Sequence, residues 1–116
     1  MTIERVRPGP RMSQAVVHAG IVYLSGQVAA TSATTEGQTR EILATIDQLL
    51  QQTGSSKSRL LSATIWLTDI GDFAAMNAVW EQWIDPANPP TRATVEARLA
   101  QPQFKVEIAV VAAVNG

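Results

Sequence analysis

Two charged residues near the C-terminus are the strongest candidates for chemistry. Glu107 lies in a segment that is otherwise apolar from 106 to 114, and burying a carboxylate is unfavourable unless it is paired or used. Arg92 follows a Pro-Pro-Thr sequence at the start of a predicted strand. There its planar guanidinium could hold a carboxylate through two parallel N–H bonds near the sheet edge. These residues indicate a pocket for a small carboxylic acid.

Both residues also have purely structural interpretations. Most arginines are exposed, so Arg92 could form a surface salt bridge. Glu107 could form an ion pair at an interface with Arg92, Arg98 or Lys105. The residue types alone leave both interpretations open.

Other groups that could do chemistry are few. The chain has no cysteine and one histidine, His18, so a thiolate nucleophile, a disulfide and a zinc site built on several histidines are excluded. We expect His18 to be a structural residue beside a turn, and we expect no metal ion or cofactor. Asn77, on a predicted helix, is either an exposed polar residue or a ligand contact.

Length and composition predict a single domain over residues 1–116. The chain is 46% hydrophobic and carries a formal net charge of -1, which favours neither disorder nor a surface for nucleic acid. The N-terminus lacks the apolar stretch of a signal peptide, and no apolar run approaches the roughly 20 residues that span a bilayer. We therefore expect a cytoplasmic protein without membrane or nucleic-acid partners.

The N-terminal half predicts a hairpin and a helix. After an arm through Arg11, short apolar runs at 15–17 and 21–25 flank Ala19-Gly20, which is typical of a hairpin. Residues 29–37 predict a loop or a short edge strand. Thr35 followed by Gln38 resembles a capping box at the start of a helix, and Gly54 marks the end of that helix.

The C-terminal half predicts strand, helix, strand and strand. Residues 61–68 alternate between apolar and polar, and Asp69 and Asp72 favour a helix start. That helix ends before Pro86, and its apolar stripe is interpreted as packing; the stripe comprises Phe73, Met76, Trp80, Trp83 and Ile84. Residues 91–99 and 104–114 then predict a hairpin whose loop contains Pro102.

Pairing within this last hairpin predicts which face of the sheet is covered. A loop centred between Gln101 and Pro102 would pair Thr94 with Ala109. The helices would then cover the face that carries Ala93, Val95, Ala97, Leu99, Phe104, Val106, Ile108 and Val110. The other face would carry Arg92, Thr94, Glu96, Glu107, Ala109, Val111 and Ala113. Such a mixed face predicts self-association around a polar pocket.

Arg92 and Glu107 would barely meet within one subunit of that arrangement. Glu107 would lie four residues from the position opposite Arg92, roughly 13 Å along the strand. A shared site therefore requires strand twist with long side chains, or one residue from each of two subunits.

Several sequence blocks together resemble the RidA (YjgF, L-PSP) family of reactive-intermediate deaminases. The C-terminal block is Pro90-Thr91-Arg92-Ala93-Thr94-Val95-Glu96, followed by Leu99 and Val106-Glu107-Ile108. Further blocks are Ser13-Gln14-Ala15, Val22-Tyr23-Leu24-Ser25-Gly26-Gln27 and Phe73-Ala74-Ala75-Met76-Asn77. The resemblance implies an α+β fold of the chorismate-mutase-like (ferredoxin-like) type, a mixed sheet with two helices on one face. It also implies a homotrimer with ligand pockets between subunits.

The resemblance also implies roles for individual residues. Arg92 matches the arginine that binds the substrate carboxylate, and Glu107 matches the glutamate that positions the hydrolytic water. Gly26 matches a backbone contact, Thr94 a small residue lining the pocket, and Asn77 a contact near its rim. The implied reaction is hydrolysis of 2-imino or enamine acids to 2-oxo acids and ammonia, which requires no metal or cofactor.

The chain departs from the family pattern at Met12. Relatives with proven deaminase activity commonly carry a tyrosine just before Ser-Gln-Ala, so Met12 removes a hydroxyl from the implied pocket. The Arg-Met-Ser variant resembles a less characterised branch of the family. Two other functions therefore stay open: a non-catalytic trimeric binder of small carboxylates or of a regulatory partner, and a ribonuclease or translation inhibitor. The near-neutral charge argues against the latter.

Overall fold

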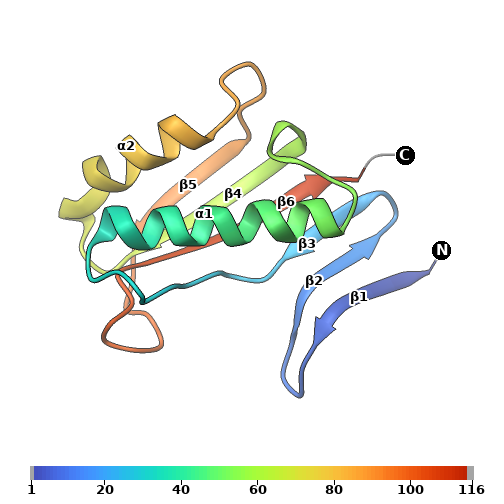
Figure 1. Cartoon of the computed structure of the whole chain (residues 1–116), viewed down its shortest axis with the longest axis horizontal. Helices are drawn as coiled ribbons and strands as arrows, with labels where there is room; N and C mark the ends of the chain where they lie inside the picture. Colours follow the sequence, from blue (N-terminus) through green and yellow to red (C-terminus); the bar gives the residue numbers. More distant parts are fainter. Residues whose placement is uncertain (1, 115–116) are drawn as a thin grey trace.

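The computed structural model describes residues 2–114 and shows a six-stranded mixed sheet with two helices on one face (Figure 1). The strand order is β1-β2-β3-β6-β4-β5, and every neighbouring pair is antiparallel except β4 with β5. The strands are β1 (Ile3–Pro8), β2 (Ser13–His18), β3 (Ile21–Leu24), β4 (Leu60–Leu67), β5 (Thr91–Glu96) and β6 (Val106–Ala113). The helices are α1 (Thr35–Gln52) and α2 (Phe73–Trp83), with short 3-10 turns at Lys57–Arg59 and Ile70–Asp72. This is the α+β architecture expected from the sequence.

The predicted hairpin at Ala19-Gly20 is confirmed. Ala19 and Gly20 both have positive φ, 53° and 78°, which is the backbone geometry that lets a two-residue turn follow the twist of its strands. The expected N-terminal arm, in contrast, is strand β1, which pairs with β2. Pro8 does not prevent this, because β1 is an edge strand where a missing N–H is tolerated.

Helix α1 begins one residue earlier than the capping-box prediction. Thr34 is the N-cap, and its side chain accepts a hydrogen bond from Gly37 N–H. The Thr35 hydroxyl instead donates to Asp72 at the start of α2, and Gln38 is buried with partners outside its own helix. The predicted stop at Gly54, whose φ is 78°, is confirmed.

The predicted hairpin between the last two strands is wrong. β5 pairs in parallel with β4, with Arg92 opposite Ala63 and Thr94 opposite Ile65, whereas β6 lies between β3 and β4. Helix α2 makes the crossover from β4 to β5, the usual connection of neighbouring parallel strands. The chain then passes the C-terminal end of β4 through residues 97–105, so Ala97, Leu99 and Phe104 belong to this connection.

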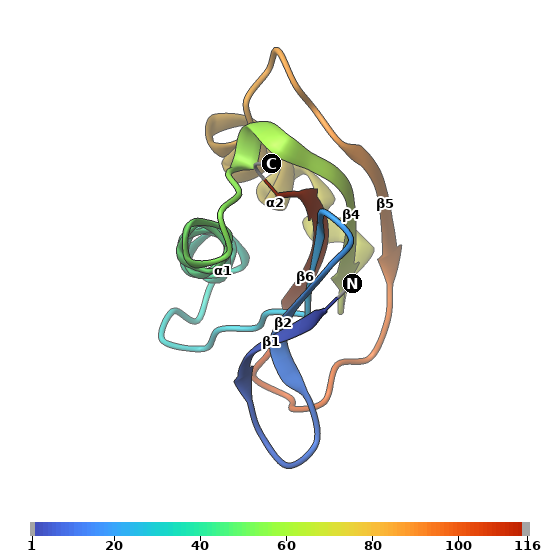
Figure 2. The ribbon, with the colours of Figure 1, turned by 90° about the vertical axis from the view of Figure 1, so that its right-hand side faces the viewer.

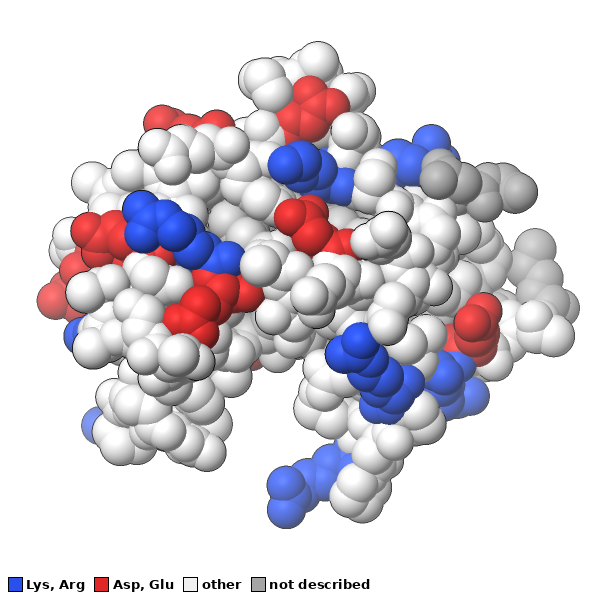
Figure 3. Space-filling view, in the orientation of Figure 1, with Lys and Arg blue, Asp and Glu red and all other residues white. Residues whose placement is uncertain are grey.

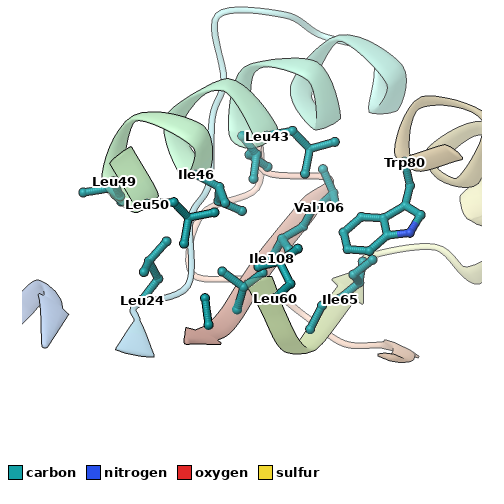
Figure 4. Close-up of a cluster of buried hydrophobic side chains, with 14 of the residues drawn as sticks. Leu24, Leu43, Ile46, Leu49, Leu50, Leu60, Ile65, Trp80, Val106 and Ile108 are labelled. Carbon is teal, nitrogen blue, oxygen red and sulfur yellow. The ribbon is translucent and has the colours of Figure 1, made fainter. Parts of the chain in front are cut away.

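This pairing reverses the predicted faces of β5. On β6, Val106 and Ile108 do pack beneath the helices as expected (Figure 4), and Val110 is buried on the same face. On β5, however, Arg92 lies against rings of α2, so Thr94 and Glu96 share the helix side, while Ala93 and Val95 point away. Ala93 and Val95, rather than Arg92 and Thr94, therefore accompany Glu107 on the opposite side.

The core forms between α1, α2 and one face of the sheet (Figures 2 and 4). Its largest fully buried side chains come from α1, β4, β6 and α2, including Ile42, Leu43, Ile46, Leu49, Leu50, Ile65, Leu67, Met76 and Ile108. No helix covers the other side of the sheet, called the open face here; strand alternation and pairing assign it Val16, Tyr23, Trp66, Val95, Glu107, Ala109 and Val111. Among residues 2–114, no helix is long and apolar enough to cross a bilayer.

Candidate functional site

Arg92 is held between β5 and the aromatic residues of α2. Its guanidinium carbon lies 5.6 Å from the ring centroid of Phe73 and 5.5 Å from that of Trp80, within the range of a cation–π interaction. Burial lowers the pKa of Arg92 from its ordinary value, and the negative charge of Glu81 acts in the opposite direction. Within residues 2–114 no carboxylate lies within 4.0 Å of the guanidinium. Arg92 remains charged, and its N–H groups are not committed to a carboxylate partner.

Two other predicted site residues lie beside Arg92. Thr94 is two residues further along the same face of β5, and its hydroxyl oxygen is buried without a hydrogen-bond partner. Asn77 is four residues after Phe73 and three before Trp80 on α2, so it belongs to the helix stripe that faces Arg92. The structure thus brings together three predicted residues, called the α2–β5 group here: Asn77, Arg92 and Thr94.

Glu107 lies on the open face, directly against Gly26. A Cβ atom placed on Gly26 would overlap Glu107 Oε2 and would lie 2.9 Å from the carboxylate carbon. Glycine at position 26 therefore leaves the space that the carboxylate occupies. Among residues 2–114 no Lys or Arg nitrogen lies within 4.0 Å of this carboxylate, so the ion pair with Arg92, Arg98 or Lys105 is not formed within one chain.

A hydrogen-bonded polar cluster lies next to the Gly26–Glu107 pair. The Gln27 side chain is buried and donates to the side-chain oxygen of Gln14 at 3.1 Å and to the Ser25 hydroxyl at 3.1 Å. The Gln27 main chain bridges Ile108, with N–H···O distances of 2.8 and 3.1 Å. These bonds fix the segment that carries Gly26 against the strand that carries Glu107.

Arg92 and Glu107 are too far apart to act on one small molecule within a single chain. Arg92 aligns with Ala63, which aligns with Val110 on β6, so Glu107 is two strands away and three residues along. At about 4.8 Å per strand and 3.3 Å per residue, their Cα atoms are roughly 14 Å apart. Their side chains also point to opposite faces of the sheet. A site that uses both must take them from different subunits.

Met12 lies in neither group. It is in the turn between β1 and β2, is 50% exposed, and lines a shallow surface pocket together with Arg7, Gly9, Pro10, Arg11 and Gln14. In the described part of the chain, the His18 ring donates a hydrogen bond from Nδ1 to the Thr2 carbonyl oxygen at 3.1 Å, consistent with its predicted structural role beside the turn.

The described surface lacks two features that would indicate particular ligands, a cluster of metal-binding side chains and, in Figure 3, a continuous basic stripe. Within residues 2–114 no group of three or more histidine, aspartate or glutamate residues is arranged to hold a metal ion. Figure 3 shows acidic and basic residues interspersed over the helix side, with the arginines of the β1–β2 hairpin separate from the rest. A continuous basic stripe is absent from this view.

The sequence interpretation missed the residues that support the candidate groups. The helical spacing predicts packing for Phe73 and Trp80, because an aromatic stripe of this kind is usually core, yet in the structure they also hold Arg92. Gln27 was not singled out at all. The available signal was its position directly after Gly26 in a polar Ser-Gly-Gln sequence at the end of a strand.

Comparison with known proteins identifies the fold and the family. The family model described as Endoribonuclease L-PSP matches residues 2–114. A RutC family protein of Haemophilus influenzae is 45% identical over 114 residues, covering 97% of this chain and 98% of the relative. The RutC family protein YoaB of Escherichia coli is also 45% identical, covering 98% of this chain and all of the relative.

A solved structure agrees closely over the same length. A member of the YjgF protein family from Neisseria meningitidis superposes with a TM-score of 0.98 at 43% identity, covering 100% of this chain and 98% of that chain. A putative translation initiation inhibitor from Salmonella typhimurium superposes with a TM-score of 0.89, also at 43% identity, covering 97% of this chain and 98% of that chain. With a matching family model and relatives that align along their whole length, the chain belongs to the L-PSP family, also called the YjgF or RutC family.

Proposed function

We propose that this protein is a cytoplasmic homotrimer that hydrolyses reactive 2-imino acids, and their enamine tautomers, to 2-oxo acids and ammonia. The active sites would lie between subunits. Each would combine the α2–β5 group of one chain with the Gly26–Glu107 pair of another, and Met12 would line the pocket wall.

The chemistry requires little beyond these side chains. Arg92 would bind the substrate carboxylate through two parallel N–H bonds, with Asn77 and Thr94 lining the pocket. Glu107 would accept a proton from water as the water oxygen bonds to the imine carbon. Transfer of that proton to the nitrogen, which takes up the C=N π pair, would give a carbinolamine. Glu107 would then move the hydroxyl proton to the nitrogen, so that the C–N bond breaks as the oxygen forms the 2-oxo carbonyl and ammonia leaves. An imine carbon is already electrophilic, so orientation and proton transfer supply the catalysis.

The observation that carries the proposal is that, within residues 2–114, neither charged group has an opposite charge within the 4.0 Å distance of an ion pair. A half-buried guanidinium and a carboxylate seated on a glycine are costly to maintain as purely structural features. A substrate carboxylate would pair with the Arg92 guanidinium, and a water molecule would hydrogen-bond to the Glu107 carboxylate. Arg92 and Glu107 lie on opposite faces of the sheet, and we therefore propose that each site takes them from two different subunits.

The direct test is consumption of freshly generated 2-iminopropionate or 2-iminobutyrate by the purified protein. We expect release of the 2-oxo acid faster than in buffer alone. Glu107→Gln is the matched control, because the amide fills the same space but cannot accept a proton. This variant should retain substrate binding and lose turnover. A variant as active as the parent would remove Glu107 from the mechanism.

A non-catalytic role is the principal alternative. Met12 in place of a hydroxyl-bearing residue favours a trimer that binds small carboxylates without turning them over. The parent protein would then be inactive on every imine tested, yet would bind a 2-oxo acid in calorimetry, and Arg92→Ala would abolish that binding.

A further inference from the structure

The buried side chain of Gln38 joins helix α1 to two other segments, one that follows Gly26 and one that precedes Glu107. Gln38 is on α1 and is only 1% exposed. Its amide nitrogen donates to the carbonyl oxygens of Ser32 at 3.1 Å and Gln103 at 2.9 Å. Its amide oxygen accepts from Lys105 N–H at 2.9 Å. Both N–H groups and the oxygen of this amide are therefore in use.

The Lys105 bond lies two residues before Glu107. The Lys105 carbonyl oxygen accepts from Thr68 N–H at 3.1 Å, so both main-chain groups of Lys105 are bound. On the other side of Glu107, Ile108 exchanges two main-chain hydrogen bonds with Gln27. The backbone that carries the Glu107 carboxylate is thus held at both ends, and Gln38 provides one of those ends.

The Ser32 bond anchors the segment that follows Gly26. Ser32 N–H donates to Glu41 of α1 at 2.7 Å, and Ser32 O accepts from Gln38. The residues that leave Gly26 and the residues that enter Glu107 consequently converge on the same helix side chain. The close approach of Gly26 to the Glu107 carboxylate depends on both segments keeping their positions.

We propose that Gln38 is a positioning residue for Glu107, setting the location of its carboxylate relative to Gly26. The proposal rests on the proposed function, in which Glu107 handles water. Gln38 itself is enclosed by α1 and the two anchored segments, and it acts through the main chain of Lys105 and Ser32. Arg92 is on β5, whereas the hydrogen-bond partners of Gln38 are Ser32, Gln103 and Lys105, so substrate binding through the Arg92 guanidinium should not depend on Gln38.

The test compares Gln38→Met with Gln38→Glu in the full-length protein. Met matches the volume of Gln but makes none of the three bonds, whereas Glu keeps an oxygen for Lys105 N–H. We expect Gln38→Met to lower kcat roughly tenfold or more with KM changed by less than about twofold. Gln38→Glu should retain more of the parent kcat than Gln38→Met.

Thr39→Val is the matched control. Thr39 is the next residue of α1, is fully buried, and donates its hydroxyl to Thr35 O at 2.7 Å, so its loss affects the same helix without affecting the Glu107 segment. The proposal is overturned if Thr39→Val lowers kcat as much as Gln38→Met, if Gln38→Met keeps the parent kcat, or if KM rises as much as kcat falls.

A second measurement separates this proposal from the proposed function. At neutral pH, Gln38→Met should shift the 13C resonance of the Glu107 side-chain carboxyl and speed hydrogen exchange at Lys105 N–H, whereas Thr39→Val should change neither. If the parent hydrolyses no imine but these changes occur, the proposed function fails and the positioning role holds. If neither signal moves, the positioning role fails whatever the activity.

Discussion

Arg92 and Glu107 illustrate how neighbouring atoms decide what a charged residue can do. The rings of Phe73 and Trp80 hold the guanidinium in place without neutralising it, because a cation–π contact leaves the N–H groups free to donate. On the other side of the sheet, the absence of a side chain at Gly26 gives the Glu107 carboxylate its space. Each group is positioned, and within residues 2–114 neither forms an ion pair within 4.0 Å.

Replacement of Arg92 by Lys should abolish imine hydrolysis while leaving the assembly intact. Lysine keeps the charge but cannot donate two parallel N–H bonds to a carboxylate. Losing that contact should cost about 2–3 kcal/mol, hence roughly a hundredfold in kcat/KM. Assembly should persist because Arg92 faces α2 rather than the open face. Parent-like kcat/KM on 2-iminobutyrate would show that Arg92 is structural.

Replacement of Gly26 by Ala should affect turnover more than stability. The added methyl would displace the end of a flexible carboxylate side chain, so the free energy of unfolding should fall by no more than about 1 kcal/mol. The moved carboxylate should lower kcat roughly tenfold. In a Glu107→Ala background the same Gly26→Ala change should have no further effect on kcat. Equal losses in both backgrounds would contradict the seating role of Gly26.

At the level of elements, α2 and β5 act as one unit. The crossover from β4 through α2 returns the chain to β5 alongside β4, and this places the helix stripe of Phe73, Asn77 and Trp80 over Arg92. Trp80 also packs against Trp83, with ring centroids 5.4 Å apart. The Trp83 indole N–H donates to Asp47 of α1 at 2.9 Å. The position of α2, and hence of Arg92, is thereby tied to α1.

Replacement of Trp80 by Leu should weaken substrate binding through Arg92. The variant loses a cation–π contact of about 0.5–2 kcal/mol, which should raise KM several-fold with a smaller change in kcat. Val79→Ala is the control, since Val79 is a buried residue of the same helix whose side chain cannot make a cation–π contact with Arg92. The measurement is KM and kcat of both variants from steady-state kinetics. An equal rise in KM would mean that Trp80→Leu acts through a general loosening of α2 and not through its contact with Arg92.

At the level of the whole molecule, the open face is the surface most suited to self-association. It carries exposed apolar side chains, among them Tyr23 and Val95, which are 48% and 46% exposed. The helices cover only the other face (Figure 2). Burial of such a face against further copies of the chain would bring the Gly26–Glu107 pair to an interface.

We expect a trimeric mass by light scattering at micromolar concentration. Val111→Glu would place a charge in the middle of the open face and should yield monomers without imine hydrolysis. Ala44→Glu, on the exposed side of α1, should leave both mass and activity unchanged. A monomeric mass for the parent protein would contradict both the interface through the open face and the active site shared between subunits.

RNA binding should be weak and nonspecific despite the endoribonuclease description of the family model. The net charge is -1, and the exposed arginines Arg5, Arg7 and Arg11 form one small group on the β1–β2 hairpin, too few for strong phosphate binding. Filter binding at physiological salt should give no submicromolar affinity. Tighter binding, or RNA cleavage that a single substitution abolishes, would favour the nuclease function instead.

The sequence alone determined the features that depend on local periodicity and turn chemistry. Alternation along residues 61–68 predicted the buried face of that strand, Ala19-Gly20 predicted the first tight turn, and Gly54 predicted the end of α1. The apolar segment around Glu107 and the Pro-Pro-Thr sequence before Arg92 were sufficient to select the two charged candidates. These predictions succeed because each depends on residues only a few positions apart.

Only the tertiary structure decided the partner of β5 and therefore the face of Arg92. Alternation in Thr91–Glu96 is equally compatible with pairing to β4 or to β6, and the two pairings give opposite faces. The apolar residues Ala93 and Val95 suggested the wrong one, because contact with Phe73 and Trp80 stabilises Arg92 on the helix side. Gln38 shows the same limit: its sequence spacing fits a helix cap, but two of its three partners, Gln103 and Lys105, are more than sixty residues away. Long-range pairing of this kind arises when the whole sheet assembles, and local sequence does not encode it.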